Sequence, residues 1–218
     1  MIKKKSKYFP LTLFSGNKDI YSHKIRMILS IKNIYVKIKQ ISFNKIPKTI
    51  TNFHNYEKNN RLFLHQIPML IDRYIILYEP NIIINYINEK FPYPSLLPIF
   101  PLERSENRLI IYNITSNWYK LINIIERNYF NYAEKAKKQL SKEVSKIVYI
   151  FIKKSSFLIN LKLTLLDCYI APILWRIKKL KIILNCKYRY KLYVYMNNLF
   201  SKRKFINSLT KYEINMNF

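Results

Sequence analysis

The N-terminal part of the chain alternates apolar and polar residues in the pattern of a strand, a helix and a second strand. Residues 11–14 form a short apolar run, and after a polar turn Asp19 can accept hydrogen bonds from the first amides of a helix. Residues 36–41 predict the second strand, because apolar side chains recur there at alternate positions. The intervening helix has apolar residues at helical spacing: Ile25, Ile28 and Leu29. Such a unit places its two strands parallel, with the helix as the crossover.

A hairpin and a helix are predicted further along. Residues 67–72 form an apolar run led by Pro68, and residues 75–78 form its hairpin partner. Pro80 then occupies a first helical position, where its missing N–H is tolerated, and the predicted helix 81–90 buries Ile83, Ile84 and Ile87. The polar stretch 42–66 is rich in Asn and Lys and predicts only a short irregular helix with a mobile loop.

Four prolines mark a change in the pattern: Pro92, Pro94, Pro98 and Pro101. Because proline cannot continue a helix, we predict a domain at 1–91, a proline-rich linker at 92–101 and a second domain at 102–218. The second domain has almost only helical periodicity, over about 103–128, 133–151, 165–180, 188–200 and from 203 onward. Thr164 and Asp167 have the spacing of a capping box at the start of the third of these helices.

Composition changes this picture in two ways. The only glycine, Gly16, cannot build a glycine-rich phosphate loop, so P-loop and Rossmann proteins are excluded. The formal net charge is +27, from 39 basic and 12 acidic residues, which is typical of nucleic-acid binding. However, the basic residues are spread along the chain and accompany many Ile, Asn and Tyr residues, so the bias of an A/T-rich genome explains the charge better.

The apolar stretches and the cysteines indicate the cellular location and the capacity to bind metal. The longest apolar stretch, 74–87, is interrupted by polar residues and is too short to span a membrane. The apolar run after the first lysines is too short for a signal peptide, so a cytoplasmic protein is expected. Cys168 and Cys186 form neither a CxxC pair nor a zinc pattern, and Cys168 is expected to be buried and reduced.

Several short sequence blocks, in order along the chain, carry a resemblance to a known family. They are residues 11–16 (LTLFSG), 19–23 (DIYSH), 90–94 (KFPYP), 118–119 (WY) and 166–176 (LDCYIAPILWR). Together with the predicted architecture they resemble the stringent starvation protein A family, whose fold is that of the glutathione S-transferases. The resemblance implies an α/β thioredoxin-like N-terminal domain followed by an all-α C-terminal domain.

The same resemblance implies a function. Members of this family associate with RNA polymerase and regulate transcription in the stress response without catalysing a transferase reaction. It therefore implies RNA polymerase holoenzyme as partner, through its sigma subunit, and DNA contact only within the transcription complex. It also implies a homodimer formed by the last helix of the first domain and the first helices of the second, with no membrane partner. No catalytic, cofactor-binding or metal-binding residue is expected.

The expected partner-binding residues are Pro92, Tyr93 and Pro94. They stand where the family has a proline, histidine, proline motif on its surface, and tyrosine keeps a planar ring with a hydrogen-bonding tip. A rigid linker turn is the alternative explanation for the two prolines. We expect Tyr93 to be the anchor, with an apolar margin formed by Phe91, Leu96 and Leu97.

Two other classes of function stay open. A glutathione-dependent transferase or reductase would need a thiol-activating group near the first helix, and the candidates are Ser15, Asp19, Tyr21 and Ser22. Against this, Pro80 follows Glu79 where transferases carry a hydroxyl residue, so two hydrogen bonds to the γ-glutamyl carboxylate would be lost, at a cost of about 3 to 6 kcal/mol. The other class is a basic nucleic-acid-binding protein.

The remaining conspicuous residues favour structural roles. Pro68 resembles the cis proline of the transferase fold, which sets the strand direction whether or not a ligand binds. The three histidines have no carboxylate or nucleophile nearby in the sequence and are expected to be solvated or structural: His23, His54 and His65. The aromatic residues of the helical half are expected to be core or interface residues: Trp118, Tyr119 and Trp175.

Overall fold

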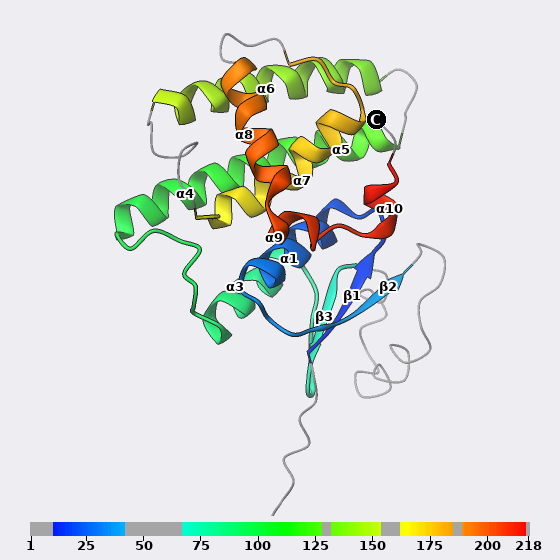
Figure 1. The fold of residues 1–218 in the computed structure, drawn as a ribbon, viewed down its shortest axis with the longest axis vertical. Coiled ribbons are helices and arrows are strands. Elements are labelled where there is room, and N and C mark those ends of the chain that lie inside the picture. The colour runs from blue at the N-terminus through cyan, green and yellow to red at the C-terminus, as the bar shows by residue number, and fades with distance from the viewer. Residues whose placement is uncertain (1–10, 42–66, 128–131, 154–161, 185–188, 217–218) are drawn as a thin grey trace, which may run out of the picture.

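The structure is a computed structural model that describes residues 11–41, 67–127, 132–153, 162–184 and 189–216. A four-stranded sheet with two helices lies at one end, and most of the later helices lie at the opposite end, while the last two short helices lie beside the first half (Figure 1). The predictions for 42–66, for His54 and His65 and for Cys186 fall outside the described residues.

The sheet has the strand order β2-β1-β3-β4. β1 (Thr12–Gly16) pairs in parallel with β2 (Lys37–Ile41), and Leu13 lies opposite Ile38. On its other side β1 pairs antiparallel with β3 (Met69–Asp72), which forms a hairpin with β4 (Ile75–Leu77). The predicted parallel pair and the hairpin are therefore confirmed.

Two helices separate the sheet from the helical half of the molecule. α1 (Ile20–Ile31) begins after Asp19, whose carboxylate accepts the amides of Tyr21 and Ser22 as the sequence predicted. α3 (Pro80–Lys90) begins with its proline at the first position and buries three isoleucines, as expected: Ile83, Ile84 and Ile87. Figure 1 shows both helices on the side of the sheet that faces the remaining helices.

The helical half follows the predicted periodicity with one correction. The segment predicted as one helix over 103–128 comprises α4 (Pro101–Asn113), a π-helical turn η3 (Ile114–Trp118) and α5 (Tyr119–Glu126). The turn buries Ile114 and Trp118. A π-turn widens the helix by one residue per turn, so it shifts the buried face without interrupting the helical pattern from which the prediction was made.

The later helices lie close to the predicted ranges. They are α6 (Ala133–Lys153), α7 (Leu165–Lys179), α8 (Arg189–Ser201), α9 (Arg203–Ile206) and α10 (Lys211–Ile214). The predicted capping box is present at α7: the amide of Thr164 donates to the Asp167 carboxylate at 2.7 Å, and the Asp167 amide donates to the Thr164 hydroxyl.

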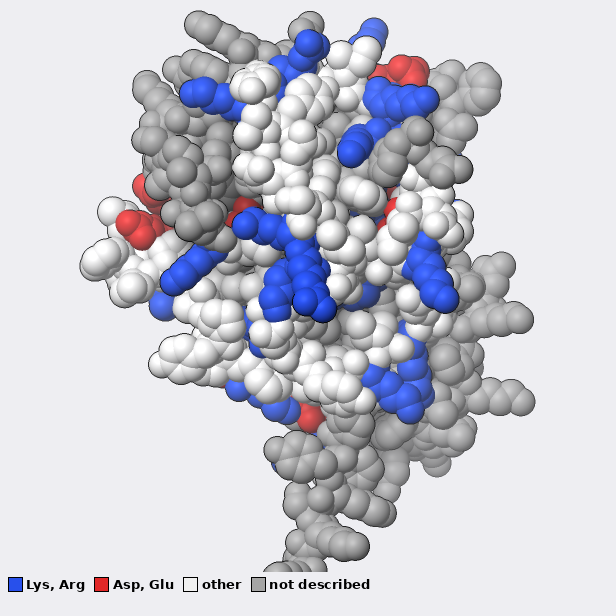
Figure 2. All heavy atoms as spheres, viewed as in Figure 1, with Lys and Arg blue, Asp and Glu red and all other residues white. Residues whose placement is uncertain are grey.

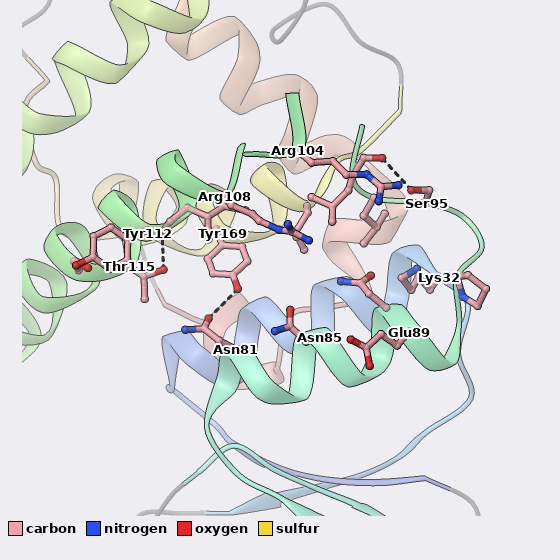
Figure 3. Close-up of a pocket in the computed structure, with 17 residues that line it drawn as sticks. Lys32, Asn81, Asn85, Glu89, Ser95, Arg104, Arg108, Tyr112, Thr115 and Tyr169 are labelled. Atoms are coloured by element: carbon pink, nitrogen blue, oxygen red, sulfur yellow. Dashed lines mark hydrogen bonds between the residues drawn. The ribbon is translucent and has the colours of Figure 1, made fainter. Parts of the chain in front are cut away.

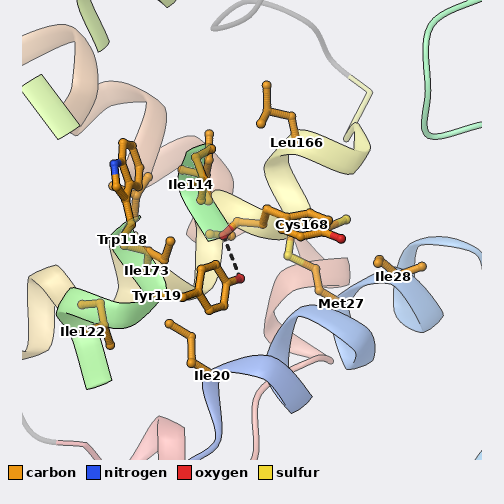
Figure 4. Close-up of a cluster of buried hydrophobic side chains, with 14 of the residues drawn as sticks. Ile20, Met27, Ile28, Ile114, Trp118, Tyr119, Ile122, Leu166, Cys168 and Ile173 are labelled. Carbon is orange, nitrogen blue, oxygen red and sulfur yellow. Dashed lines mark hydrogen bonds between the residues drawn. The ribbon is translucent and has the colours of Figure 1, made fainter. Parts of the chain in front are cut away.

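The core joins the two halves through α1 and α7. Figure 4 shows Met27 and Ile28 of α1 beside Cys168 of α7, with Trp118 and Tyr119 on the neighbouring helical segment. Tyr119 is fully buried and donates a hydrogen bond to the carbonyl of Tyr169 at 3.0 Å. Trp175 is half-buried and packs edge-on against Phe200 and Phe205. The three aromatic residues predicted for the core or an interface therefore pack in the core, and Cys168 is buried as predicted.

Among the described residues, no helix is both long and apolar enough to cross a bilayer. The segment between α3 and α4, residues 91–100, contains neither helix nor strand.

Candidate functional site

The proline segment forms an exposed projection between the two halves of the molecule. The Tyr93 side chain is 84% exposed, and Pro92 and Pro94 are exposed on either side of it. The Tyr93–Pro94 peptide bond is cis. Of the expected apolar margin, Phe91 and Leu97 are half-buried. Leu96 is 4% exposed, so it belongs to the core rather than to the surface, which corrects that part of the expectation.

The base of this projection is tied to the rest of the fold by Lys32. Its side chain is almost fully buried at the end of α1, and its Nζ donates to the carbonyls of Phe91 at 2.7 Å and Pro94 at 2.9 Å. The carbonyl of Leu96 also accepts the amide of Leu165 at 2.8 Å. Hydrogen bonds from a charged donor are the stronger kind, so Tyr93 stands on a fixed base. The sequence did not predict this role of Lys32; the available signal was its helical spacing from Ile28 and Leu29, and in the structure it is the C-cap residue of α1.

The first of the expected transferase positions, the turn between β1 and α1, is filled with internal hydrogen bonds. Ser22 donates its hydroxyl to Asp19 at 2.6 Å and accepts the Gly16 amide at 3.0 Å. Ser15 accepts from the guanidinium of Arg26. Since the hydroxyl hydrogen of Ser22 is committed to a carboxylate, it cannot also stabilise a thiolate. Burial raises the pKa of the Asp19 carboxyl.

Tyr21 is the remaining hydroxyl of that set. It accepts a hydrogen bond from the side-chain amide of Asn123 at 3.3 Å, and its ring lies 5.0 Å from that of Tyr119. Burial raises the pKa of Tyr21, which makes its phenol a poorer acid. The structure thus brings Ser15, Asp19, Tyr21 and Ser22 to the start of α1 but engages their polar atoms with the protein itself.

The second transferase position lies at the start of α3. Glu79 has a φ of 65° and caps the helix through the amide of Asn81, while Pro80 has no amide to offer. The Ile67–Pro68 bond is cis, as the sequence resemblance implied. This segment therefore keeps the strand geometry of the fold without the hydroxyl and N–H that would hold a carboxylate.

A buried ion cluster joins α1, α7 and the C-terminal tail. Glu213 of α10 is fully buried; its Oε2 accepts from Arg26 at 2.6 Å, and its Oε1 lies 3.5 Å from Arg176. Nδ1 of His23 is 3.6 Å from the same Oε1. Burial lowers the pKa of His23 to about 3, so this histidine is neutral at pH 7 and the two arginines carry the positive charge. The role of His23 is therefore structural, which is one of the two roles (solvated or structural) expected for the histidines.

The tail that carries Glu213 lies against the turn between β1 and α1 (Figure 1). The hydroxyl of Thr210 donates to the carbonyl of Asn17 at 2.8 Å, and Trp175 donates to the carbonyl of Glu213 at 3.3 Å. The C-terminal tail is therefore held against the turn between β1 and α1 and against α7. No sequence signal links these residues, because the partners are distant along the chain.

Lys24 is a second buried cation near the same place. Its side chain is fully buried, and its Nζ lies over the rings of three tyrosines, Tyr21, Tyr119 and Tyr169, at 5.4, 5.0 and 4.4 Å from their centroids. Within the described residues its hydrogen bond goes to Oδ1 of Asn81 at 3.3 Å. Burial lowers the pKa of Lys24 to about 7, although aromatic faces partly offset the cost of the charge.

The chain is similar to glutathione S-transferases in both a sequence domain and the overall fold. Residues 9–89 match the family described as Glutathione S-transferase, N-terminal domain. The whole described fold is similar to a glutathione S-transferase of the Antarctic clam Laternula elliptica, with a TM-score of 0.76, 16% identity and 95% of each chain covered. A Tau-class enzyme from mango, Mangifera indica, gives a TM-score of 0.75 at 18% identity over 94% of each chain. The chain therefore has the glutathione S-transferase fold.

Similarity in sequence identifies a narrower family than similarity in fold. The chain is 34% identical to a protein named Stringent starvation protein A homolog from Coxiella burnetii, over 93% of both chains. It is 33% identical to one of the same name from Haemophilus ducreyi, over 91% of this chain and 89% of that relative. The chain belongs to the stringent starvation protein A family, which confirms the family and the fold class expected from the sequence.

Proposed function

We propose that the chain is a non-catalytic regulator that binds RNA polymerase holoenzyme through the projection at Pro92, Tyr93 and Pro94. The observation that carries the proposal is a large aromatic side chain, 84% exposed, on a base fixed by Lys32. Because Lys32 holds the backbone on either side of Tyr93, binding has to order only the side chain. Tyrosine is among the residues that most often dominate interfaces. The proposed partner, RNA polymerase holoenzyme with its sigma subunit as the contact, rests on the resemblance to the stringent starvation protein A family.

Replacing Tyr93 by alanine is expected to reduce the amount of holoenzyme recovered with the tagged protein by about tenfold or more, because anchor residues contribute about 2 kcal/mol or more. The measurement is affinity capture from cytoplasm with quantification of polymerase subunits. Tyr190→Ala is the matched control, since Tyr190 is 80% exposed on α8. Equal recovery with Tyr93→Ala and wild type would remove the projection from the binding surface.

The absence of transferase activity is part of the proposal. Its support is that Ser22 is committed to Asp19 and that Pro80 offers no amide at the start of α3. A glutathione-dependent enzyme is the alternative, and it requires Tyr21 to activate the thiol although burial raises its pKa. Calorimetry with glutathione separates the two, because an enzyme of this fold must bind it.

We also propose a homodimer in which a second copy covers α4 and neighbouring parts of α3. α4 has no buried residue, and its side chains at positions i, i+7 and i+10 lie on one face: Leu102, Leu109 and Tyr112, each 63 to 74% exposed. Ile82 of α3 is 51% exposed. Apolar side chains grouped in this way favour burial against a partner, and two-fold pairing is the commonest arrangement.

Leu109→Glu is expected to give a monomer where the wild type is a dimer, because two carboxylates would be buried without partners in the interface. Light scattering at micromolar concentration is the measurement. Ile183→Glu, at a 76% exposed position after α7, serves as control and should leave the dimer intact. A monomeric wild type, or a dimer that tolerates Leu109→Glu, contradicts this interface.

The basic surface supports a secondary role near DNA within the transcription complex. Figure 2 shows many more basic than acidic side chains on one face, with a group near its centre over the position of α9. The chain there runs Lys202, Arg203 and Lys204. Such a group attracts phosphate without reading sequence, so we propose that it reinforces polymerase binding rather than selecting promoters, in a cytoplasmic protein.

A further inference from the structure

A pocket of about 390 Å³ lies between the C-terminal end of α7, the turn that follows it and one face of α8. The residues that line it from α8 are spaced along one side of that helix: Arg189, Tyr193, Met196 and Asn197. The pocket shares no lining residue with the cleft between α3 and α4, where Tyr169 donates to Asn81 at 2.9 Å (Figure 3). It therefore lies apart from the proposed dimer interface.

The floor of the pocket is apolar. It consists of side chains that are 1 to 7% exposed: Ile177, Ile182, Leu184 and Met196. The amide of Ile182 donates to the carbonyl of Ile177 at 3.1 Å, in a bonding pattern that commonly ends a helix. The carbonyl of Ile183 accepts the hydroxyl of Ser141 of α6 at 2.8 Å, which ties the turn to a neighbouring helix. The floor is thus pre-formed, so a ligand does not have to order it.

Three cations stand around this apolar floor. Lys178 of α7, Lys181 of the turn and Arg189 of α8 line the pocket with exposed side chains, and no acidic residue is among its described lining. The side chains of Lys181 and Arg189 form no hydrogen bond or ion pair with any residue in the described ranges. Their charges are available to a ligand, and the complementary ligand is anionic.

The apolar surface continues outside the pocket. Two lining residues are themselves exposed, Ile183 by 76% and Tyr193 by 44%, and Val194, the next residue on α8, is 41% exposed. Figure 2 shows mainly uncharged side chains over the position of α8, bordered by basic ones. An exposed apolar patch with a polar border is typical of an interaction site.

We propose that this pocket is a docking site for a peptide segment of another protein, in which a large apolar side chain is flanked by acidic residues. The apolar side chain packs on the floor, and the neighbouring carboxylates meet Lys178, Lys181 and Arg189. Burial of the side chain drives binding, while the charges fix its register and select against basic partners. The proposal does not depend on polymerase binding through Tyr93, because the pocket contains no residue of the segment 91–100.

Nucleic acid suits the site less well than a peptide does. Its phosphates can pair with the three cations, but the apolar floor offers no hydrogen bonds to base edges. A peptide with an apolar residue between acidic ones uses both the charge and the floor, so it is the occupant that the pocket favours.

The test is fluorescence anisotropy of the full chain with three short labelled peptides. The first has a central phenylalanine with two glutamates on each side; in the second alanine replaces the phenylalanine, and in the third lysine replaces the glutamates. Saturable binding is expected for the first. The second should bind about tenfold more weakly, because it lacks the anchor that fills the pocket, and the third should not bind.

Asn197→Glu and Asn198→Glu form a matched pair of variants. Both residues are exposed on α8 and both substitutions change the net charge equally, but only Asn197 lines the pocket. Asn197→Glu is expected to weaken binding of the phenylalanine peptide by about tenfold, since it places a carboxylate beside those of the peptide. Asn198→Glu should bind almost as wild type does.

Four outcomes overturn the proposal. Equal weakening by the two variants shows only attraction to a basic surface, and equal affinity for the phenylalanine and alanine peptides shows that no side chain enters the pocket. Failure of the phenylalanine peptide to saturate at millimolar concentration excludes the site. A labelled oligothymidylate strand is the comparison for nucleic acid, and loss of its binding in Asn197→Glu but not in Asn198→Glu assigns the pocket to nucleic acid instead.

Discussion

Replacing Glu213 by alanine is expected to lower the free energy of unfolding by about 3 to 5 kcal/mol, because it leaves the buried guanidinium of Arg26 without its carboxylate partner. Arg176 keeps a second carboxylate partner, Glu126, at 3.1 Å. Arg26 and Arg176 are 4% and 0% exposed, so neither guanidinium could reach water without displacing the C-terminal tail. The substitution also removes the carboxylate that accepts the Thr210 amide in the capping box of α10.

The free energies of unfolding of wild type and Glu213→Ala are measured by denaturant unfolding and compared. Glu134→Ala is the control, since Glu134 is 71% exposed and pairs with Lys137 three residues away on α6. Pairs of that kind contribute about 0.2 to 1 kcal/mol, so the control should unfold almost as the wild type does. A loss below about 1 kcal/mol for Glu213→Ala would mean that the cluster is not what fixes the tail.

The stability that Glu213 contributes decreases as the pH is lowered. Burial alone would raise the pKa of its carboxyl, but the positive groups around it outweigh burial and lower that pKa. The stability that Glu213 contributes is therefore present above its unfolded pKa and is lost as the pH falls through its folded pKa.

Stability is expected to rise by about 2 kcal/mol between pH 7 and pH 9 through Lys24 alone, because its pKa falls from 10.5 to about 7 on folding. In this range the unfolded chain keeps the proton on Lys24 while the folded chain releases it. The unfolded state then binds more protons, so raising the pH favours the folded state. The contribution grows until the pH reaches the unfolded pKa.

Measuring the free energy of unfolding of Lys24→Met from pH 7 to pH 9 isolates the contribution of Lys24. The variant should be more stable than wild type at pH 7, and the difference should shrink by about 2 kcal/mol at pH 9 as wild-type Lys24 becomes neutral. Lys120→Met, at an exposed position of α5, controls for the change of net charge. Parallel pH profiles for wild type and Lys24→Met would show that Lys24 stays charged in the folded protein.

Local features of the sequence predict most of the fold. The Asp19 cap, the capping box at Thr164 and the proline at the start of α3 are each decided by residues within four positions of one another, and each is present. The parallel pair β1–β2 was predicted from its helical crossover and the β3–β4 hairpin from its short turn, whereas the antiparallel pairing of β1 with β3 was not predicted. The π-helical turn at 114–118 was not predicted, since it adds one residue per turn to a pattern that still looks helical.

Long-range polar contacts could not be predicted in the same way. Arg26 and Glu213 are 187 positions apart, and nothing in either neighbourhood indicates the other. Lys24 of α1 and its C-cap residue Lys32 each lie four positions from Ile28 in the sequence, on the side that the apolar periodicity assigns to the core, which was the available signal. What they contact depends on how α3, α7 and the proline segment pack against α1, and a single sequence does not determine that packing.

We propose that the chain binds RNA polymerase and does not use glutathione. Competition on purified components tests it most directly: labelled protein is titrated with RNA polymerase holoenzyme in the presence and absence of excess glutathione. We predict saturable binding to the holoenzyme that glutathione leaves unchanged. Absence of binding to the holoenzyme, together with saturable binding of glutathione by the same preparation, would contradict the claim.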